Sequence, residues 1–240
     1  MKKFSLSRRQ LLQSSWVSAG LFGLGAFSKV AWAQDTQPPG NRDGASCQSI
    51  VMTDDGPLYP PTAIPWLSDL TQLPGRSGRP EGQLLYLFGR IRDHQCRPVA
   101  GASVEIWQAD NSGKYKHPRG GPANQLDLNF GYFGRVRTGE DGSYLFKTIV
   151  PSAYSLGDIR RAAHIHLKMR SLTHGVLTTE MYFEGDEDER IRSIDPVFSS
   201  RRKETRHRLI VPTESPEAYP DLKLDFEKDA VCCKYDLAFR

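Results

Sequence analysis

The stretch Ala163-His164-Ile165-His166-Leu167-Lys168-Met169 alternates apolar and polar side chains along seven residues. Alternate side chains of a β-strand lie on opposite faces, so this pattern predicts a strand whose apolar side faces a core and whose polar side faces a cleft or a second layer. His164 and His166 could then bind one metal ion, and neutral imidazoles suit zinc, copper, iron or nickel. An ordinary strand with two hydrogen-bonded histidines is the alternative.

Further short strands are expected on both sides of this one. They fall at residues 84–90, 102–107, 135–138, 143–149, 176–183, 208–211, 222–226 and 234–239. Loops are expected at residues 111–133 and 151–161, and a short helix at residues 186–194. Short strands separated by turn signals, without heptads or repeats, predict a mainly β fold: a β-sandwich of mostly antiparallel strands with long active-site loops and few short helices.

The first 33 residues have the composition of a targeting segment. Arg8-Arg9 precedes a mostly apolar run at residues 16–27, and Ala31-Trp32-Ala33 is a cleavage pattern. The segment resembles a twin-arginine export signal, and the apolar run is shorter than the roughly 20 residues of a membrane span. We expect a periplasmic protein that meets the membrane only during export. The expected units are a signal peptide (1–33), a flexible N-terminal arm (34–52) and a folded domain (53–240).

The charge balance argues against a nucleic-acid partner. The whole chain has a net charge of +4, but residues 1–33 hold five basic residues and no acid, which leaves −1 on the remainder. Nucleic-acid binding therefore loses its electrostatic support.

The chain has four cysteines and no CxxC pair. Cys232 and Cys233 are adjacent and are not expected to bond to each other, because neighbouring residues rarely reach disulfide geometry. One of them could pair with Cys47 or Cys96, and free buried thiols are the alternative.

Several motifs in a fixed order resemble the signature of the intradiol ring-cleavage dioxygenases, the family of protocatechuate 3,4-dioxygenase and catechol 1,2-dioxygenase. The resemblance covers roughly residues 53–190. Its main motifs are Leu87-x-Gly89-x-Ile91, Val104-Glu105-Ile106-Trp107-Gln108-Ala109-Asp110, Gly113-x-Tyr115, Asp127-x-Asn129-Phe130, Gly142-x-Tyr144-x-Phe146, Pro151-x-x-Tyr154, Arg161-x-Ala163-His164-Ile165-His166 and Tyr182-Phe183-Glu184-Gly185-Asp186.

The resemblance implies a ligand set and a reaction. It assigns Tyr115, Tyr154, His164 and His166 as ligands of Fe(3+), with Tyr154 leaving the iron when a catechol binds. The implied reaction uses O2 to cleave the ring between the two hydroxylated carbons, giving a cis,cis-muconate-type product. A non-catalytic aromatic-binding β-sandwich of the same ancestry is the alternative. A hydrolytic zinc site is disfavoured, because zinc prefers Cys, His and carboxylate donors.

Two further residues are expected to act on the substrate. Arg161 stands where the family has an arginine that could stabilise developing negative charge, and a surface ion pair is the alternative. Glu180 stands where protocatechuate dioxygenases often have Gln, so it could pair with Arg161 or weaken the binding of acidic catechols. Leu156, in place of a frequent Trp, also leaves the choice of catechol open. A homo-oligomer is neither indicated nor excluded.

Overall fold

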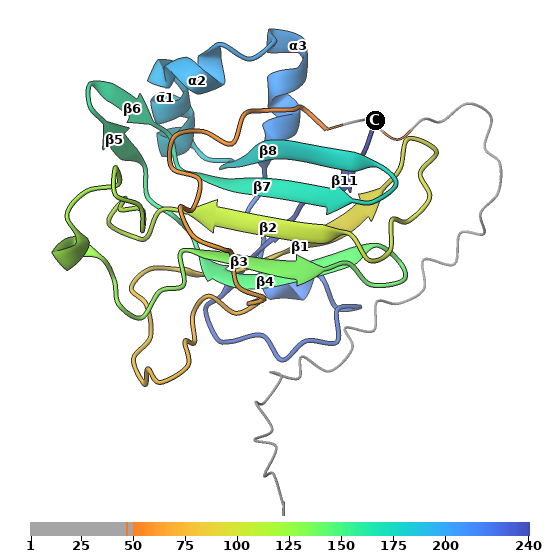
Figure 1. Ribbon diagram of the computed structural model, residues 1–240, viewed down its shortest axis with the longest axis horizontal. Coiled ribbons are helices and arrows are strands. Elements are labelled where there is room, and N and C mark those ends of the chain that lie inside the picture. Colours follow the sequence, from red (N-terminus) through yellow and green to blue (C-terminus); the bar gives the residue numbers. More distant parts are fainter. Residues whose placement is uncertain (1–46, 48–49) are drawn as a thin grey trace, which may run out of the picture.

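A computed structural model describes residue 47 and residues 50–240, and its strands form two main layers (Figure 1). The expected export signal at residues 1–33 and most of the expected arm at residues 34–52 lie outside the described residues. The prediction of a mainly β fold with few short helices is confirmed. In the described part of the chain, the helices are too short or too polar to cross a membrane.

The larger sheet has five strands in the order β3-β2-β7-β8-β9. Their bounds are β2 (Ser103–Gln108), β3 (Phe133–Arg137), β7 (His164–Ser171), β8 (Gly175–Phe183) and β9 (Ile210–Val211). Strand β7 lies in the middle and pairs antiparallel with β2 and β8. This register sets His166 opposite Trp107 on one side and opposite Glu180 on the other.

The second sheet is built around β1 (Leu84–Arg92). Strand β4 (Ser143–Ile149) pairs antiparallel with β1 over most of its length. Strands β10 (Val231–Lys234) and β11 (Leu237–Ala238) pair with β1 in parallel, one after the other. The last two strands, β10 and β11, therefore lie in the same sheet as the first strand, β1.

The hydrophobic core lies between the two sheets. Ile165, Leu167 and Met169 of β7 are fully buried in it, as the sequence alternation predicts. The same core cluster takes its β1 and β4 members from the second sheet, namely Leu85, Leu87, Ile91, Tyr144, Phe146 and Ile149. The polar face of β7 must therefore lie on the outer side of the larger sheet.

The outer face of β7 is also covered. Residues 50–66 run across it, and there Asp55 forms an ion pair with Lys168 of β7 (Figure 1). A hairpin and three short helices lie beside the β8 edge of the sheet: β5 (Tyr154–Leu156), β6 (Ile159–Arg161), α1 (Asp186–Ile194), α2 (Pro196–Ser199) and α3 (Lys203–Arg206). Three 3₁₀ turns complete the elements, η1 (Ala123–Gln125), η2 (His207–Leu209) and η3 (Pro216–Ala218).

Some local predictions were wrong. Residues 151–161 contain the β5–β6 hairpin instead of a loop, because Gly157 at φ 60° allows a two-residue turn that pairs Tyr154 with Arg161. Residues 222–226 form no strand, and their apolar side chains pack on β1 from irregular backbone. The expected strand at 234–239 is two strands, interrupted where the Asp236 side chain accepts the backbone N–H of Arg90.

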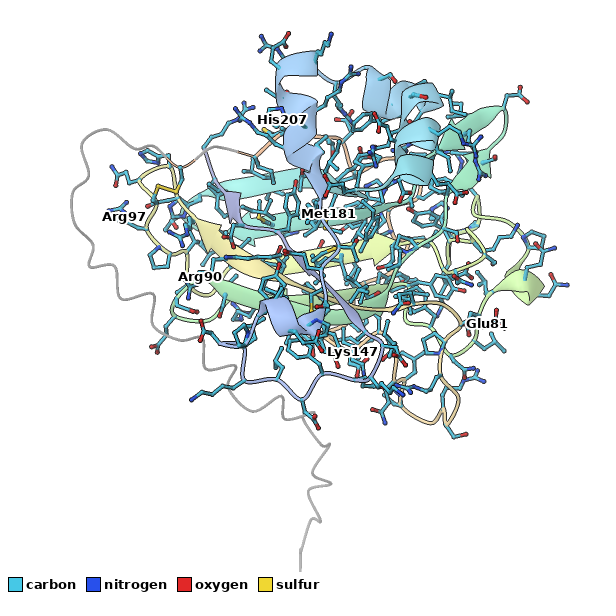
Figure 2. The ribbon with its side chains drawn as sticks, turned by 180° about the vertical axis from the view of Figure 1, so that it is seen from behind. Glu81, Arg90, Arg97, Lys147, Met181 and His207 are labelled. Atoms are coloured by element: carbon cyan, nitrogen blue, oxygen red, sulfur yellow. A yellow bond between two sulfur atoms is a disulfide. The ribbon has the colours of Figure 1, made fainter. Side chains whose placement is uncertain are left out.

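Cys47 is joined to Cys96 by a disulfide (Figure 2). Of the two alternatives for Cys232 and Cys233, a bond to one of these cysteines is therefore wrong, and free buried thiols are confirmed. The physical reason is that successive side chains of strand β10 point to opposite faces of the sheet. Cys233 points into the main core and Cys232 into a separate cluster around Tyr86, so both thiols are buried away from the arm.

The Cys47–Cys96 bond should stabilise the fold, because it closes a loop with a sequence separation of 49. We expect the double variant Cys47→Ser, Cys96→Ser to lose about 2–4 kcal/mol of unfolding free energy. Thermal unfolding with and without a reductant measures this loss. The reductant should lower the Tm of the wild type and leave that of the double variant unchanged, and an unaffected wild type would contradict the prediction.

Candidate metal centre and active site

The two histidines of β7 turn the same ring nitrogen toward each other. His164 Nε2 and His166 Nε2 lie 3.1 Å apart, and both side chains are buried. His164 Nδ1 donates a hydrogen bond to the Ala162 carbonyl at 2.6 Å, so the proton is on Nδ1 and Nε2 carries a free lone pair. Because metal–imidazole bonds are about 2.0–2.1 Å long, two nitrogens at this separation fit two ligands of one ion.

The two tyrosines reach the histidines from different segments. Tyr115 lies in the loop after β2 and Tyr154 begins β5, and both are buried. Their ring centroids are 5.0 Å apart, Tyr154 lies 5.6 Å from His164, and Tyr115 lies 6.5 Å from His166. The fold thus brings together all four of the residues that the sequence suggests as metal ligands.

The loop that carries Tyr115 is held by a buried carboxylate. Asp110 accepts hydrogen bonds from the backbone N–H groups of Ser112 at 2.8 Å and Lys114 at 2.9 Å. Gly113, at φ 76°, passes the Ala153 carbonyl so closely that a Cβ would lie 2.8 Å from its oxygen. The two tyrosine-bearing segments are therefore in direct contact, and only glycine fits between them.

Burial shifts the protonation of all four side chains. Burial raises the pKa of Tyr115 well above 10, and it raises the pKa of Tyr154 to about 12 although the nearby Arg161 charge acts the other way. Burial, with neighbouring positive charge, lowers the pKa of His164 and His166 well below 6.5. The Tyr115 hydroxyl has no hydrogen-bond partner among the described residues. A bound cation would stabilise the tyrosines as phenolates and would bind the free lone pairs of the neutral imidazoles.

Arg161 lies in the interior, so its interpretation as a surface ion pair is wrong. Its Nε is 3.1 Å from Asp195 Oδ2 and 3.2 Å from Oδ1. Its Nη2 donates to Glu180 at 3.0 Å and to the Tyr182 hydroxyl at 3.1 Å. The remaining Nη1 lies 3.5 Å from the Tyr154 hydroxyl. The guanidinium is thus held from two sides and directed toward a candidate ligand.

Glu180 pairs with Arg161, one of the two roles that its sequence position suggests. Burial alone would raise its pKa, but at neutral pH, where His166 is uncharged, the Arg161 charge and a 2.9 Å hydrogen bond from Tyr182 keep the pKa below 4.5. His164, His166 and Glu180 have potential ligand atoms within 4.8 Å of one another. Glu180 nevertheless lies 3.8 Å from His166 Nδ1, on the side of the ring away from the facing Nε2 atoms. It is better placed to orient His166 than to bind the ion.

The donor set fits a ferric ion. Two imidazole nitrogens and two phenolic oxygens are available around one point, and the buried Tyr115 hydroxyl lacks any other partner in the described structure. Phenolate is a hard, anionic oxygen donor, which favours Fe(III) over zinc.

Trp107 packs against the site. Its indole ring stacks on His166 with a centroid distance of 4.6 Å and an interplanar angle of 2°. The stacking follows from the β2–β7 register and restricts the rotation of the His166 ring.

Sequence reasoning missed Asp195 and Tyr182. Asp195 is fully buried and accepts from the backbone N–H of Ala162 at 2.9 Å as well as from Arg161. The Asp195-Pro196 pair signals a helix start, and Asp195 does cap α2. No local signal, however, links it to an arginine 34 residues earlier.

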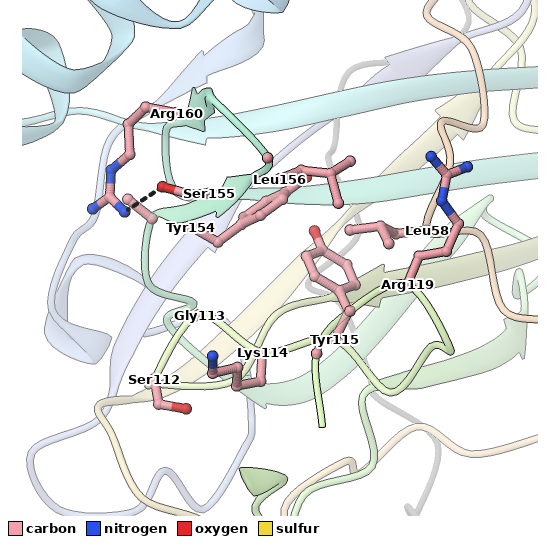
Figure 3. Close-up of a pocket in the computed structure, with 14 residues that line it drawn as sticks. Leu58, Ser112, Gly113, Lys114, Tyr115, Arg119, Tyr154, Ser155, Leu156 and Arg160 are labelled. Atoms are coloured by element: carbon pink, nitrogen blue, oxygen red, sulfur yellow. Dashed lines mark hydrogen bonds between the residues drawn. The ribbon is translucent and has the colours of Figure 1, made fainter. Parts of the chain in front are cut away.

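A cavity of about 390 Å³ opens beside the two tyrosines (Figure 3). Leu58, Ala153 and Leu156 supply its aliphatic side chains, and Leu58 and Leu156 lie beside the two phenol rings. The volume is in the usual range for small-molecule sites. Leu156, one of the departures noted in the sequence, therefore lines this cavity.

Comparison with known proteins identifies the family. A family model described as Dioxygenase matches residues 55–232, and the chain belongs to this family, that of the intradiol ring-cleavage dioxygenases. Members of the family use non-haem iron.

Similar sequences include the protocatechuate 3,4-dioxygenase beta chain of Burkholderia cepacia, 37% identical over 146 residues, which are 59% of this chain and 61% of that protein. Catechol 1,2-dioxygenase 1 of Acinetobacter lwoffii is 34% identical over 152 residues, or 56% of this chain and 46% of that protein. The chain thus matches only about half to three-fifths of the length of these relatives.

Similar structures include catechol 1,2-dioxygenase from Pseudomonas arvilla C-1, with a TM-score of 0.59 and 25% identity over 78% of this chain and 61% of that one. The fold also matches an intradiol ring-cleavage dioxygenase from Tetranychus urticae, with a TM-score of 0.58 and 20% identity over 81% of this chain and 95% of that one.

Asp195 should be essential for the stability of this region. Asp195→Asn keeps a side chain that can cap α2 but removes one of the two carboxylates that neutralise Arg161. We expect a loss of about 3–5 kcal/mol in unfolding free energy, measured by urea denaturation. The exposed Asp221→Asn makes the same chemical change as a control and should cost less than about 0.5 kcal/mol. Equal losses in the two variants would contradict the role of Asp195.

Proposed function

We propose that this protein is a non-haem Fe(III) dioxygenase that cleaves the ring of a catechol-type aromatic between its two hydroxylated carbons. Both atoms of O2 enter the product, a cis,cis-muconate-type diacid. The observation that carries the proposal is the convergence of two buried phenols and two buried imidazoles beside a cavity, in a chain of the intradiol family.

The side chains have separate roles in this proposal. Tyr115, Tyr154, His164 and His166 would hold the iron, which when bound supplies a Lewis acid and an electron sink for the catecholate. The Tyr154 oxygen, as a phenolate, accepts the proton of a substrate hydroxyl. Arg161 Nη1, 3.5 Å from that oxygen, would stabilise the Tyr154 phenolate before it takes up this proton, and would then stabilise negative charge on the substrate.

A binding module without turnover is the second candidate. The observation that favours it is the Glu180 carboxylate, which together with Asp195 offsets the charge of Arg161. An arginine with two anionic partners is a weaker stabiliser of developing negative charge than one with a neutral amide beside it. Oxygen uptake separates an enzyme from a binder.

The visible spectrum tests the ligand set. Iron-loaded protein should be red-brown from tyrosinate-to-Fe(III) charge transfer, and catechol should shift the band and start oxygen uptake. Tyr115→Phe and His166→Ala each remove one donor, so both should lose the colour and reduce oxygen uptake to background.

Tyr86→Phe is the matched control, because Tyr86 is buried in the other sheet and packs on Phe226. It should keep both the colour and the activity. Wild-type protein that stays colourless with iron would overturn the proposed iron site. A coloured protein that binds catechol without consuming oxygen would establish the binding module instead.

We also propose that the chain is exported by the twin-arginine route and cleaved after Ala33. The Arg8-Arg9 pair and the Ala31-Trp32-Ala33 pattern support this, and so does the Cys47–Cys96 disulfide, since such bonds persist in oxidising compartments.

Cell fractionation tests the export proposal. Protein from the periplasm should begin at Gln34 by N-terminal sequencing, and the double variant Arg8→Lys, Arg9→Lys should remain uncleaved in the cytoplasm. Periplasmic accumulation of this variant would contradict the twin-arginine route.

A further inference from the structure

The two histidines of β7 differ in what faces their second ring nitrogen. His164 Nδ1 donates to the Ala162 carbonyl, which is a neutral acceptor. His166 Nδ1 is buried and has no hydrogen-bond partner in the part of the chain that the structure describes. With Nε2 of His166 as a metal ligand, the single proton of its neutral ring is on this unpartnered Nδ1.

A carboxylate oxygen faces His166 Nδ1. Glu180 Oε1 lies 3.8 Å from it, and both side chains are buried. This separation is too long for a hydrogen bond, so a negative charge acts on the dipole of the ring N–H. Burial strengthens the interaction, because bulk water does not screen groups in the interior. One of the two imidazoles therefore has an anion beside its N–H, and the other has a neutral carbonyl.

The Glu180 carboxylate is held in this position. The β7–β8 register sets Glu180 directly opposite His166. Its Oε1 accepts from Arg161 at 3.0 Å and its Oε2 accepts from the Tyr182 hydroxyl at 2.9 Å. Arg201 Nη2 lies 3.8 Å from Oε2. Two guanidinium groups beside one carboxylate keep it ionised, so the charge next to His166 is permanent.

The His166 ring is also held in place. The Trp107 indole covers one of its faces, with the two planes nearly parallel. The backbone at Gly56 runs close to its edge, since a Cβ on Gly56 would lie 3.6 Å from His166 Cε1. The imidazole therefore presents Nδ1 to Glu180 and Nε2 to His164 in one orientation.

We propose that Glu180 is a positioning residue that makes His166 a stronger donor and thereby favours Fe(III) over Fe(II) at this site. The proposal rests on the proposed function, because it requires iron at the four donors. A negative charge beside the ring N–H increases the electron density on Nε2. A more basic ligand and a nearby negative charge both stabilise the higher oxidation state of a metal.

A redox titration of the iron-loaded full chain tests the proposal. Glu180→Gln keeps the size of the side chain and removes its charge. We expect the ratio of the Fe(III) to the Fe(II) binding constant to fall about tenfold, which raises the one-electron midpoint potential by about 59 mV. The tyrosinate-to-Fe(III) band should move to longer wavelength, because an ion that is easier to reduce accepts charge at lower energy.

Two further variants separate the charge of Glu180 from the shape of the site. Glu180→Asp keeps the charge on a shorter side chain, so its potential should lie closer to that of the wild type than the potential of Glu180→Gln does. Glu105→Gln is the matched control. Glu105 is also a buried carboxylate of the larger sheet, but it lies opposite Lys168 instead of His166. This variant should leave the potential and the band nearly unchanged.

The outcomes distinguish the two proposals. The role of Glu180 would be overturned by an unchanged potential in Glu180→Gln, or by a shift as large in Glu180→Asp or Glu105→Gln. In that case, oxygen uptake with catechol would still support the proposed function. A shift confined to Glu180→Gln in a protein that consumes no oxygen would support the role of Glu180 and overturn turnover.

Discussion

Strand β7 is buried on both of its faces, and the two faces have opposite chemistry. Its apolar face completes the core between the sheets, so a slip of one residue against β2 or β8 would turn Lys168 and the histidines into that core. Its polar face needs partners instead, because a buried polar group without one costs about 1–3 kcal/mol. Ala162 satisfies His164 and Asp55 satisfies Lys168. The geometry of the candidate site follows from this single register.

Charge compensation shapes the structure around the histidines. A buried guanidinium is unfavourable unless it is paired and hydrogen-bonded, and Arg161 has two carboxylates and two phenols around it. One carboxylate, that of Glu180, comes from strand β8, which pairs with β7. The other, that of Asp195, comes from the start of α2. The short helices beside the sheet therefore do more than cover its edge, because they bring Asp195 to the arginine and to the backbone that leads into β7.

The interior and the cavity use positive charge differently. Inside, Arg161 and Lys168 are matched by acids, which fixes their positions. At the cavity, three cations from the Tyr115 loop and the β5–β6 hairpin are left unmatched in the described structure. Both features occur in a chain whose charge beyond residue 33 is close to neutral.

Local pattern alone determined the mainly β fold, the two faces of β7 and the pairing of His164 with His166, because alternation is a property of the strand itself. Spacing and family signature together singled out Tyr115 and Tyr154, but only the tertiary structure brought their loops into contact, through Asp110 and the glycine at 113. The β5–β6 hairpin, the Cys47–Cys96 bond, the burial of Arg161 and its pairing with Asp195 were likewise decided by folding. The disulfide and the two features of Arg161 depend on contacts between segments that are distant in sequence. The hairpin depends on a turn whose flanking residues show no strand pattern. Neither kind of feature leaves a signal in the local sequence.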